Sequence, residues 1–248
     1  MKFTIITVCY NSASTIDQTI SSVLSQSYSE FEYIIIDGGS ADETTKIIKK
    51  FRDKRIRLIS EADDGIYDAL NKGMHQANGD FILILHSDDY WDNEKYLEIL
   101  KENLLRSSAK IAYGNAKFIS KTKRTVLRKW ISSSYKSYYL ILGWMPPHTS
   151  LVLSKDVVAK IGNYRLDLGS ASDYDYVLRV FKEFGDVSTY INKIYVIMRV
   201  GGVSTKISSL LINNILQDYK ILRIHFSFFF AIVALVLKRL NKLTQILG

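Results

Sequence analysis

Apolar and polar positions along the first half of the chain recur with the periods of strands and helices. Four short apolar runs predict buried strands at Thr4–Cys9, Tyr33–Ile36, Ile56–Ile59 and Phe81–Leu85. The segments between them predict helices that begin at Ser14 and span about Ser40–Phe51 and Ile66–Ala77. This alternation predicts a parallel sheet with helices on both faces. In such sheets ligands lie at the carboxyl ends of the strands.

Polar residues and glycine support these helix boundaries. Ser14 is expected to cap the first helix, and Ser40 with Glu43 has the spacing of a capping box. Asn78-Gly79 suits a left-handed cap at the end of the third helix.

The second half of the chain is mixed. Short apolar runs predict strands at Ile111–Tyr113, Thr125–Trp130, Thr149–Leu153 and Ile194–Val200. A helix is predicted from Ser172 to Gly185, and a long helix after Ser204. We therefore divide the chain into residues 1–110 and 111–205, which share one domain, and a helical tail, 206–248.

An apolar run, Phe226–Leu237, lies within this tail and has basic residues on both sides. Its twelve residues would rise about 18 Å as a helix, whereas a bilayer core is about 30 Å thick. The run is therefore too short to span a membrane. A basic-flanked, aromatic-rich helix fits one that lies in the membrane interface. The alternative is a helix that packs on its own domain or on a partner chain in a homodimer.

Composition indicates a folded protein from a reducing compartment. Hydrophobic residues make up 47% of the chain and charged residues 23%, which is typical of a globular protein. The single cysteine excludes a disulfide framework within the chain. The apolar run at residues 3–10 is too short and too rich in β-branched residues for a signal peptide. We expect a cytoplasmic protein that is peripheral on the inner face of the cell membrane.

Positive charge is unevenly distributed. Lys and Arg number 33 against 25 Asp and Glu, a net charge of +8, and no acidic residue lies between Glu102 and Asp156. A solvated basic face would explain this span without a ligand. The functional alternatives are nucleic acid, an anionic membrane, or phosphorylated substrates.

Polar side chains follow each of the four predicted strands of the first half. In order they are Tyr10 and Asn11, then Asp37, then Glu61 and Asp63, then Ser87, Asp88 and Asp89. The turn after the first strand has no glycine and no P-loop occurs, which disfavours a dinucleotide or P-loop site. A phosphorylated ligand then needs another positive charge, and Mg²⁺ typically binds one or two carboxylates plus substrate phosphates. Asp88 and Asp89 therefore predict a divalent metal site.

Longer motifs extend this picture across most of the chain. They read TIITVCYNSASTIDQTISSVLSQSY, IIIDGGSADET, SEADDGIYDALNKG, FILILHSDDYW, WMPPHTSLVLSKDVVAKIGNY and SASDYDYVLRV. Together they resemble the family 2 glycosyltransferases, and the third resembles the branch that builds bacterial surface polysaccharides, such as colanic-acid-type transferases. The resemblance covers about residues 2–205. It implies a GT-A fold, an α/β arrangement with a Rossmann-like, mostly parallel central sheet, helices on both faces and a C-terminal helical extension.

The resemblance also implies roles for donor residues. Thr7, Tyr10, Asn11 and Asp37 would hold the nucleoside, Asp63 would lie by the base, and Asn71 and Lys72 would line the donor pocket. The family's metal motif is Asp-x-Asp or a close relative, and here the triplet is Ser87-Asp88-Asp89, without the first carboxylate. Asp88 would face the ribose or a metal-bound water. Asp89 would bind Mn²⁺ or Mg²⁺ directly.

The catalytic base is expected in the segment Ser172-Asp173-Tyr174-Asp175. Positions i and i+2 point to nearly opposite sides of a helix, so at most one carboxylate faces the sugar. Asp175 can pair with Arg179 four residues on. Asp173 matches the family's base position and is the predicted base. The alternative for either residue is an acid that only complements the helix dipole.

Three further elements are candidates for the acceptor side. His148 resembles the family's Pro-His element beside the acceptor, although a lone His is often a structural hydrogen-bonder. Trp144 is a candidate to stack on a sugar ring, with packing as the alternative. Residues 201–204, Gly-Gly-Val-Ser, could bring backbone amides to the diphosphate.

The resemblance implies an inverting, metal-dependent transfer of a sugar from a nucleotide-sugar, commonly a UDP-sugar. The acceptor would be a saccharide or a polyprenyl-diphosphate-linked sugar in surface polysaccharide synthesis. Two rival functions stay open: a sugar-phosphate nucleotidyltransferase, and a non-enzymatic protein that binds a membrane surface. Since the strand-end edge is acidic, nucleic acid is no longer the expected partner.

Overall fold

Strands and helices alternate through the first half of the protein, as the sequence predicts. The computed structural model describes residues 1–120, 125–200 and 210–247. The first half contains β1 (Phe3–Cys9), α1 (Ile16–Leu24), β2 (Phe31–Asp37), α2 (Thr44–Lys50), β3 (Ile56–Ser60), α3 (Ile66–His75) and β4 (Phe81–Ile84). β1 pairs in parallel with β2 and β4, and β2 with β3, so these four strands end at one edge of the sheet.

The second half adds shorter strands and more helices. They are β5 (Tyr90–Trp91), α4 (Tyr96–Ser107), β6 (Ile111–Ser120), β7 (Val126–Trp130), β8 (Val152–Ser154), α5 (Lys155–Ile161), α6 (Ser172–Phe184) and β9 (Ser188–Val200). Short 3₁₀ turns lie at Ser137–Tyr139, His148–Ser150, Leu166–Ala171 and Gly185–Val187. Sequence analysis did not predict α4, α5 or β5.

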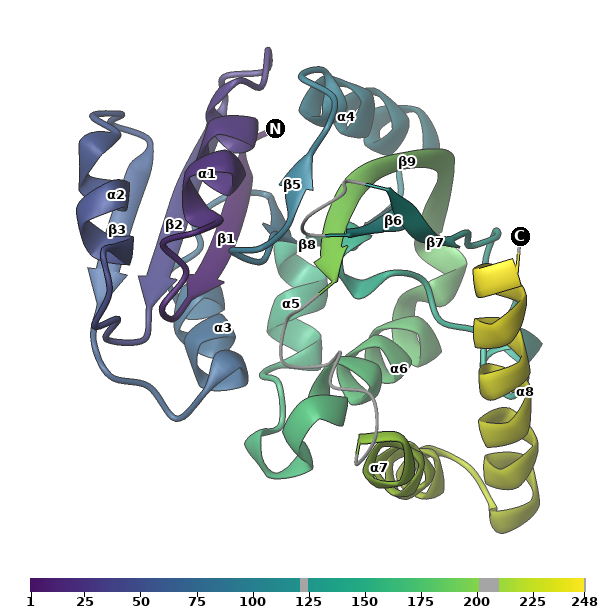
Figure 1. Cartoon of the computed structure of the whole chain (residues 1–248). Coiled ribbons are helices and arrows are strands. Elements are labelled where there is room, and N and C mark those ends of the chain that lie inside the picture. The colour runs from purple at the N-terminus through teal and green to yellow at the C-terminus, as the bar shows by residue number, and fades with distance from the viewer. Residues whose placement is uncertain (121–124, 201–209, 248) are drawn as a thin grey trace.

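One sheet joins the two halves. Within the described residues its order is β3-β2-β1-β4-β8-β6-β9-β5, and β7 pairs with β6 outside this path. β8 is antiparallel to both β4 and β6, whereas β9 runs parallel to β6. Figure 1 shows the β6–β7 hairpin and β9 beside the parallel strands of the first half. The predicted α/β fold with a largely parallel sheet and a mixed second half is therefore confirmed.

Helices cover both faces of this sheet because β1 and β2 are apolar on both sides. Ile5 packs in a core with Ile20 of α1 and Leu97 of α4. The neighbouring Ile6 points to the opposite core, which includes Met74 of α3 and Val177 of α6. Runs that are apolar at every position are what a sheet buried on both faces requires.

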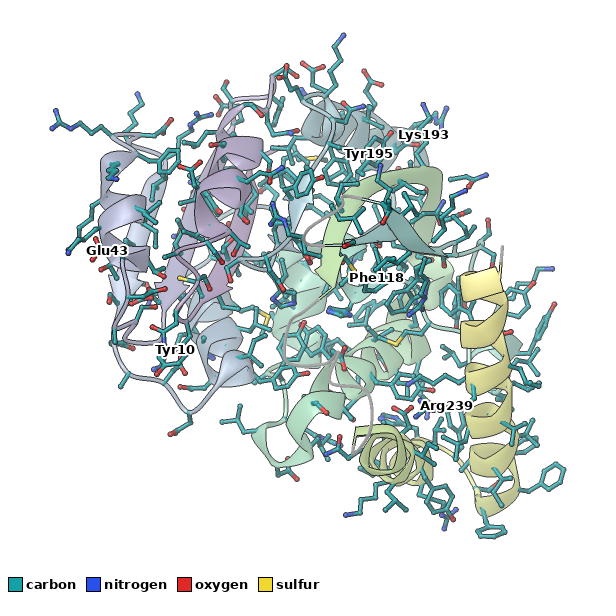
Figure 2. The ribbon with its side chains drawn as sticks, viewed as in Figure 1. Tyr10, Glu43, Phe118, Lys193, Tyr195 and Arg239 are labelled. Atoms are coloured by element: carbon teal, nitrogen blue, oxygen red, sulfur yellow. The ribbon has the colours of Figure 1, made fainter. Side chains whose placement is uncertain are left out.

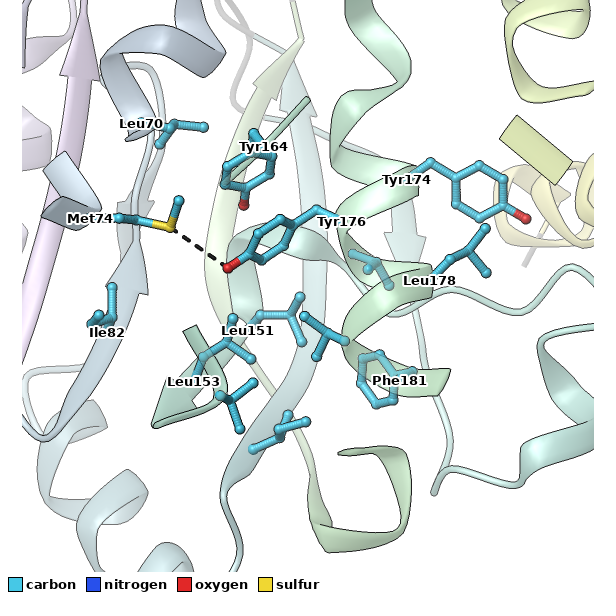
Figure 3. Close-up of a cluster of buried hydrophobic side chains, with 14 of the residues drawn as sticks. Leu70, Met74, Ile82, Leu151, Leu153, Tyr164, Tyr174, Tyr176, Leu178 and Phe181 are labelled. Carbon is cyan, nitrogen blue, oxygen red and sulfur yellow. Dashed lines mark hydrogen bonds between the residues drawn. The ribbon is translucent and has the colours of Figure 1, made fainter. Parts of the chain in front are cut away.

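Aromatic side chains fill the second core at the junction of the halves (Figure 3). The rings of Tyr164 and Tyr176 stack with their centroids 4.0 Å apart. The Tyr176 hydroxyl donates to the sulfur of Met74 at 3.7 Å. Asn71 of α3 adds a paired link, since its side chain accepts from the Tyr164 amide at 2.8 Å and donates to the Tyr164 carbonyl at 3.0 Å. These contacts fix α3 against the segment that leads into α6.

The predicted N-terminal caps of the first two helices are wrong. α1 begins at Ile16 with Thr15 as its N-cap residue, so Ser14 does not cap it. α2 begins at Thr44, whose amide donates to the carboxylate of Asp42 at 2.9 Å. Ser40 is not available as a cap because its hydroxyl donates to Asp37.

Gly79 does not adopt the left-handed conformation predicted for it, since α3 ends at His75 with a right-handed cap at Gln76. Glycine is required there for a different reason. A Cβ atom at this position would lie 2.7 Å from the backbone nitrogen of Thr4. Residue 79 passes against the start of β1, where only a hydrogen fits.

The C-terminal part forms two helices, α7 (Leu210–His225) and α8 (Phe228–Leu247), which lie beside α6 in the yellow-green part of Figure 1. Ala231 and Ala234 of α8 are fully buried. Lys238 and Arg239 of α8 both donate to Asp218 of α7, at 2.9 Å and 2.6 Å. α8 therefore packs on its own chain through one side. Among the described residues, none of the helices is both long enough and apolar enough to cross a bilayer.

Candidate active site

The ends of β1 and β2 are tied together by polar contacts. Asn11 has a φ of 49°, and its side-chain oxygen accepts from the amide of Ala41 at 2.9 Å. Asp37 is fully buried and accepts from the hydroxyls of Ser40 and Ser60, at 2.5 Å and 2.7 Å. Both carboxylate oxygens of Asp37 therefore accept hydrogen bonds from the protein itself. Asp37 fixes the segment that follows β2 against the end of β3.

Tyr10 and Asp63 stand at the same edge but are accessible. Tyr10 is 64% exposed and lies beyond the end of β1 (Figure 2). Asp63 accepts from the amide of Gly65 at 2.9 Å. Its carboxylate rests against Gly38, where an added Cβ atom would lie 2.4 Å from an Asp63 oxygen. Gly38 thus leaves the room that Asp63 occupies beside β2.

Three residues that the resemblance implies as donor contacts are held by the protein instead. Thr7 is fully buried, and its hydroxyl donates to the carbonyl of Leu85 at 2.7 Å. Asn71 is 7% exposed, and its side-chain amide forms two hydrogen bonds with the backbone of Tyr164. Lys72 forms ion pairs with Glu61 and Asp68, both at 3.2 Å. The structure therefore brings Lys72 to the rim of the edge, but places the side chains of Thr7 and Asn71 in the interior.

The predicted metal motif follows β4. Ser87 shares a hydrogen bond of 2.9 Å with Ser12 of the β1–α1 turn, which links the first and fourth strand ends. The backbone carbonyl of Asp89 accepts from Thr19 of α1 at 2.7 Å, and the Asp89 side chain is 2% exposed. The motif is thus fixed by its backbone.

Asp89 has the features of a cation ligand. Its Oδ2 atom is buried and has no hydrogen-bond partner among the described residues. Burial, followed by the charge of Asp88, raises the pKa of Asp89 well above its usual range. Arg199 lies close enough to oppose this rise, and a divalent cation would add further positive charge that favours the charged form of Asp89. The described residues contain no cluster of three or more His, Cys, Asp and Glu, so further ligands would come from a bound diphosphate and water.

Two histidines connect this motif to α6. His86 precedes the motif and is half-buried, and its ring lies 5.7 Å from the ring of His148. Burial, followed by the charge of His148, lowers the pKa of His86 to about 3, so His86 is neutral at pH 7. Nδ1 of His148 lies 3.3 Å from Oδ2 of Asp173. The strand-four end, His148 and the predicted base therefore form one continuous cluster.

Asp173 and Asp175 have different environments, as the helix geometry predicts. Asp173 lies in the first turn of α6, is 25% exposed, and accepts from the amide of Tyr174 through Oδ1 at 2.7 Å. Asp175 is fully buried and pairs with Arg179 and His225, both at 2.8 Å. Asp175 therefore holds α6 to its neighbours. Of the two carboxylates, only Asp173 reaches the cluster with His148.

Sequence analysis selected Trp144, but the structure places Trp130 beside His148. The Trp144 ring packs in an aromatic cluster, 5.1 Å from Phe181 and 5.7 Å from Tyr113. The Trp130 ring lies 6.5 Å from the His148 ring. The pairing of β7 with β6, which brings Trp130 opposite Ala116, accounts for this position and is not visible in a single sequence.

Arg199 is a further residue that sequence analysis did not select. From the end of β9, its guanidinium donates to the backbone carbonyl of Asp88 at 2.7 Å and to the side chain of Gln18. A cation thus lies beside the predicted metal motif from a strand far along the chain. The predicted diphosphate loop at 201–204 and the start of the helix after Ser204 fall outside the described residues.

Known proteins are similar to this chain in both sequence and fold. The family described as Glycosyl transferase family 2 matches residues 4–155. An uncharacterized glycosyltransferase of Mycobacterium tuberculosis is 31% identical over 179 residues, which cover 71% of this chain and 67% of that protein. An Escherichia coli protein named UDP-Glc:alpha-D-GlcNAc-diphosphoundecaprenol beta-1,3-glucosyltransferase WfgD is 34% identical over 139 residues, which cover 56% of this chain and 54% of that protein.

A solved structure supports the fold independently. Staphylococcus aureus TarS 1-349 in complex with UDP-GlcNAc superposes with a TM-score of 0.71 at 19% identity, over 90% of this chain and 66% of that chain. The chain therefore spans between about half and two thirds of the length of these three proteins.

Proposed function

The chain belongs to glycosyl transferase family 2, and on that premise we propose that it transfers a sugar from a UDP-sugar to a hydroxyl of a lipid-linked saccharide. The family match and the named relatives support transfer of a glycosyl group. The observation that carries the proposal is the buried Asp89 carboxylate with an unpartnered oxygen, joined through His86 and His148 to an accessible carboxylate at Asp173. The name of the Escherichia coli relative states a UDP-Glc donor and a GlcNAc-diphosphoundecaprenol acceptor, which supports a UDP-sugar and a lipid-linked acceptor here.

Residues 1–110 would bind the donor. Tyr10 and Asp63 are accessible at the edge where a parallel sheet binds its ligands, so they are the proposed contacts to the nucleoside. Asn11, Asp37 and Lys72 would shape this edge through the contacts described above. Asp88 and Asp89 would hold Mn²⁺ or Mg²⁺ together with the donor diphosphate. When bound, the metal supplies charge that stabilises the departing diphosphate.

Residues 111–205 would bind the acceptor and supply the base. An acceptor hydroxyl is a weak nucleophile until a nearby group accepts its proton. Oδ1 of Asp173 is engaged by the Tyr174 amide, which leaves Oδ2, the atom near His148, to accept that proton. Attack from this side expels the diphosphate from the opposite face and inverts the anomeric carbon. One carboxylate is enough for such a displacement, whereas a glycosidase uses two.

Arg199 would add a fixed positive charge on the donor side. Its guanidinium is held in place by Gln18 and the Asp88 carbonyl, beside the proposed metal motif. A charge that is fixed before the reaction stabilises developing negative charge without reorganisation.

Metal-dependent protection by UDP tests the proposal. A ligand that binds only the folded state stabilises it by RT ln(1 + [L]/Kd), which is about 2.7 kcal/mol at a concentration one hundred times Kd. We expect UDP with Mn²⁺ to raise the unfolding temperature and UDP with EDTA to raise it much less. Equal protection with and without the metal would remove Asp89 from the proposed role. A lack of protection by any nucleoside diphosphate would argue against the donor site itself.

The C-terminal helices support a second part of the proposal, contact with a membrane surface. Phe228 and Phe229 begin α8 and are 61% and 68% exposed, although Ala231 and Ala234 bury the other side of the same helix. Arg223 of α7 lies over the Phe228 ring at 5.7 Å, and Lys220 of α7 is exposed. Exposed aromatic rings next to cations are typical of a segment that enters the headgroup region of anionic bilayers. We propose that the α7–α8 corner, residues 220–230, makes this contact.

A further inference from the structure

The β6–β7 hairpin carries an arginine beside two aromatic rings, and the proposed donor site does not include this group. Phe118 and Arg128 are paired across the two strands, and Trp130 lies two residues after Arg128 on the same side of β7. The guanidinium of Arg128 lies 5.0 Å from the Phe118 ring centroid and 4.9 Å from that of Trp130. The two rings are themselves nearly parallel, with an interplanar angle of 15°. Figure 2 labels Phe118 on this hairpin, near the middle of the molecule.

This arrangement places a cation where it can meet a phosphate group. A guanidinium presents several N–H donors in one plane, and two of them can bind two oxygens of one phosphate. Arg128 is partly buried, and burial lowers its pKa to about 10, which leaves it charged at neutral pH. The chain from residue 103 to residue 155 contains no acidic side chain, so the hairpin itself adds no negative charge beside Arg128.

The hairpin is connected to the proposed base by direct neighbours. Trp130 lies 6.5 Å from His148, and His148 Nδ1 lies 3.3 Å from Oδ2 of Asp173. The Trp130 side chain is also anchored, because its indole nitrogen donates to the carbonyl of Met145 at 3.1 Å. Arg128, Trp130, His148 and Asp173 are therefore linked by successive contacts between neighbours.

We infer that Arg128 is an acceptor-specificity residue, which binds the phosphate next to the acceptor sugar while the reacting hydroxyl of that sugar lies at Asp173. The inference rests on the proposed function, since it assigns the second substrate of the same site. Trp130 and His148 would line the space between Arg128 and Asp173, where the sugar ring lies. The chemical class recognised is a glycosyl phosphate or diphosphate, and a neutral glycoside would lack the group that Arg128 holds.

The test compares two acceptors that differ only at the anomeric substituent. One is GlcNAc-α-diphosphate with a short phenoxyalkyl chain, and the other is the neutral octyl α-glycoside of GlcNAc. UDP-glucose with Mn²⁺ is the donor, and kcat/KM is measured for each acceptor from UDP release. We expect the wild-type protein to prefer the diphosphate by at least about tenfold, the range of a charge-assisted hydrogen bond. Arg128→Gln should abolish this preference, mainly through KM for the diphosphate acceptor, and Arg128→Lys should retain part of it.

Lys129→Gln is the matched control, because Lys129 is an exposed neighbour on the opposite face of β7 and has the same charge. It should keep the wild-type preference, and both Gln variants should keep the wild-type KM for UDP-glucose. If Arg128→Gln unfolds, the comparison is made with Arg128→Lys and Lys129→Gln.

Each contrary result has a distinct meaning. An undiminished preference in Arg128→Gln, or the same loss in Lys129→Gln, would overturn the inference, as would a rise in the KM for UDP-glucose. UDP release without any preference in the wild-type protein would also overturn it, while leaving the proposed donor chemistry in place. If UDP-glucose gives no turnover, the same comparison is made with the UDP-sugar that does. No UDP release from any UDP-sugar would reject the proposed function and the inference together.

Discussion

The two acidic residues in the first turn of α6 allow a paired prediction about stability and catalysis. Asp175→Asn removes the charge from a fully buried carboxylate whose partners, Arg179 and His225, are both 2.8 Å away. Removing one partner of a buried ion pair costs about 3–5 kcal/mol. Arg165, the third partner, is 43% exposed and can return to water, so we expect the low end, about 3 kcal/mol. For a chain of this size that lowers the unfolding temperature by about 6–12 °C.

Asp173→Asn should show the opposite pattern. Asp173 is 25% exposed, and an Asn oxygen can still accept from the Tyr174 amide, so the unfolding free energy should change by less than about 1 kcal/mol. Loss of a general base costs about 10²–10⁴-fold in rate. Urea unfolding and initial rates of sugar transfer, both measured at a temperature where each variant is folded, separate the two effects. Transfer that survives in Asp173→Asn but is lost in folded Asp175→Asn would refute the assignment of the base.

The pH dependence of stability gives the same pair a second readout. Burial alone would raise the pKa of Asp175, but the hydrogen bonds from His225 and Arg179 outweigh it, so the folded-state pKa is lowered. The stabilisation is therefore complete above the unfolded-state pKa of about 4, and is lost as pH falls through the lower folded-state value. In Asp175→Asn the acid-induced loss below about pH 4 should be shallower than in the wild type. Identical slopes would contradict the proposed ion pairs.

Three further variants test other parts of the account. Asp89→Ala should remove the metal-dependent part of UDP protection, and unchanged affinity in the presence of Mn²⁺ would exclude Asp89 as a ligand. Asn71→Ala should lower the unfolding free energy by about 1–3 kcal/mol, because the backbone groups of residue 164 lose their hydrogen-bond partner. The KM for the donor should change little. A large rise in this KM at unchanged stability would indicate that Asn71 contacts the donor. Phe228→Ser with Phe229→Ser should reduce sedimentation with anionic vesicles, whereas Leu105→Ser, an equally exposed residue of α4, should not; equal sedimentation of both variants would exclude the α7–α8 corner.

The fold was largely predictable because short apolar strands alternate with helices throughout its first half. The run Tyr33–Ile36 is apolar at every position, as expected of a strand in a sheet buried on both faces, and the strand-end carboxylates then had to meet at one edge. The helix ends were less predictable. Ser40 has the spacing of a cap, but its hydroxyl bonds to the buried Asp37 at the end of β2, three residues before it. Local spacing does not reveal such competition.

The candidate site was predictable where its residues lie in one motif, and not where they come together by topology. Asp88, Asp89 and Asp173 stand in short polar segments at element ends, which the sequence displays directly. Trp130 and Arg199 reach the site from strands whose pairing is set by long-range contacts. Thr7 is the opposite case. The sequence suggests its hydroxyl as a ligand contact, but in the structure this hydroxyl donates to the carbonyl of Leu85 in the core.

The account's central claim is that one edge of the sheet combines a metal-dependent donor site with a base on α6. The most direct test is the release of nucleoside diphosphate from UDP-, GDP- and TDP-sugars, with and without Mn²⁺ and with and without a diphosphate-linked acceptor. We predict release from at least one donor that requires both the metal and the acceptor, and that is lost in Asp89→Ala and in Asp173→Asn. Release that is unaffected by metal removal and by both substitutions would contradict the claim.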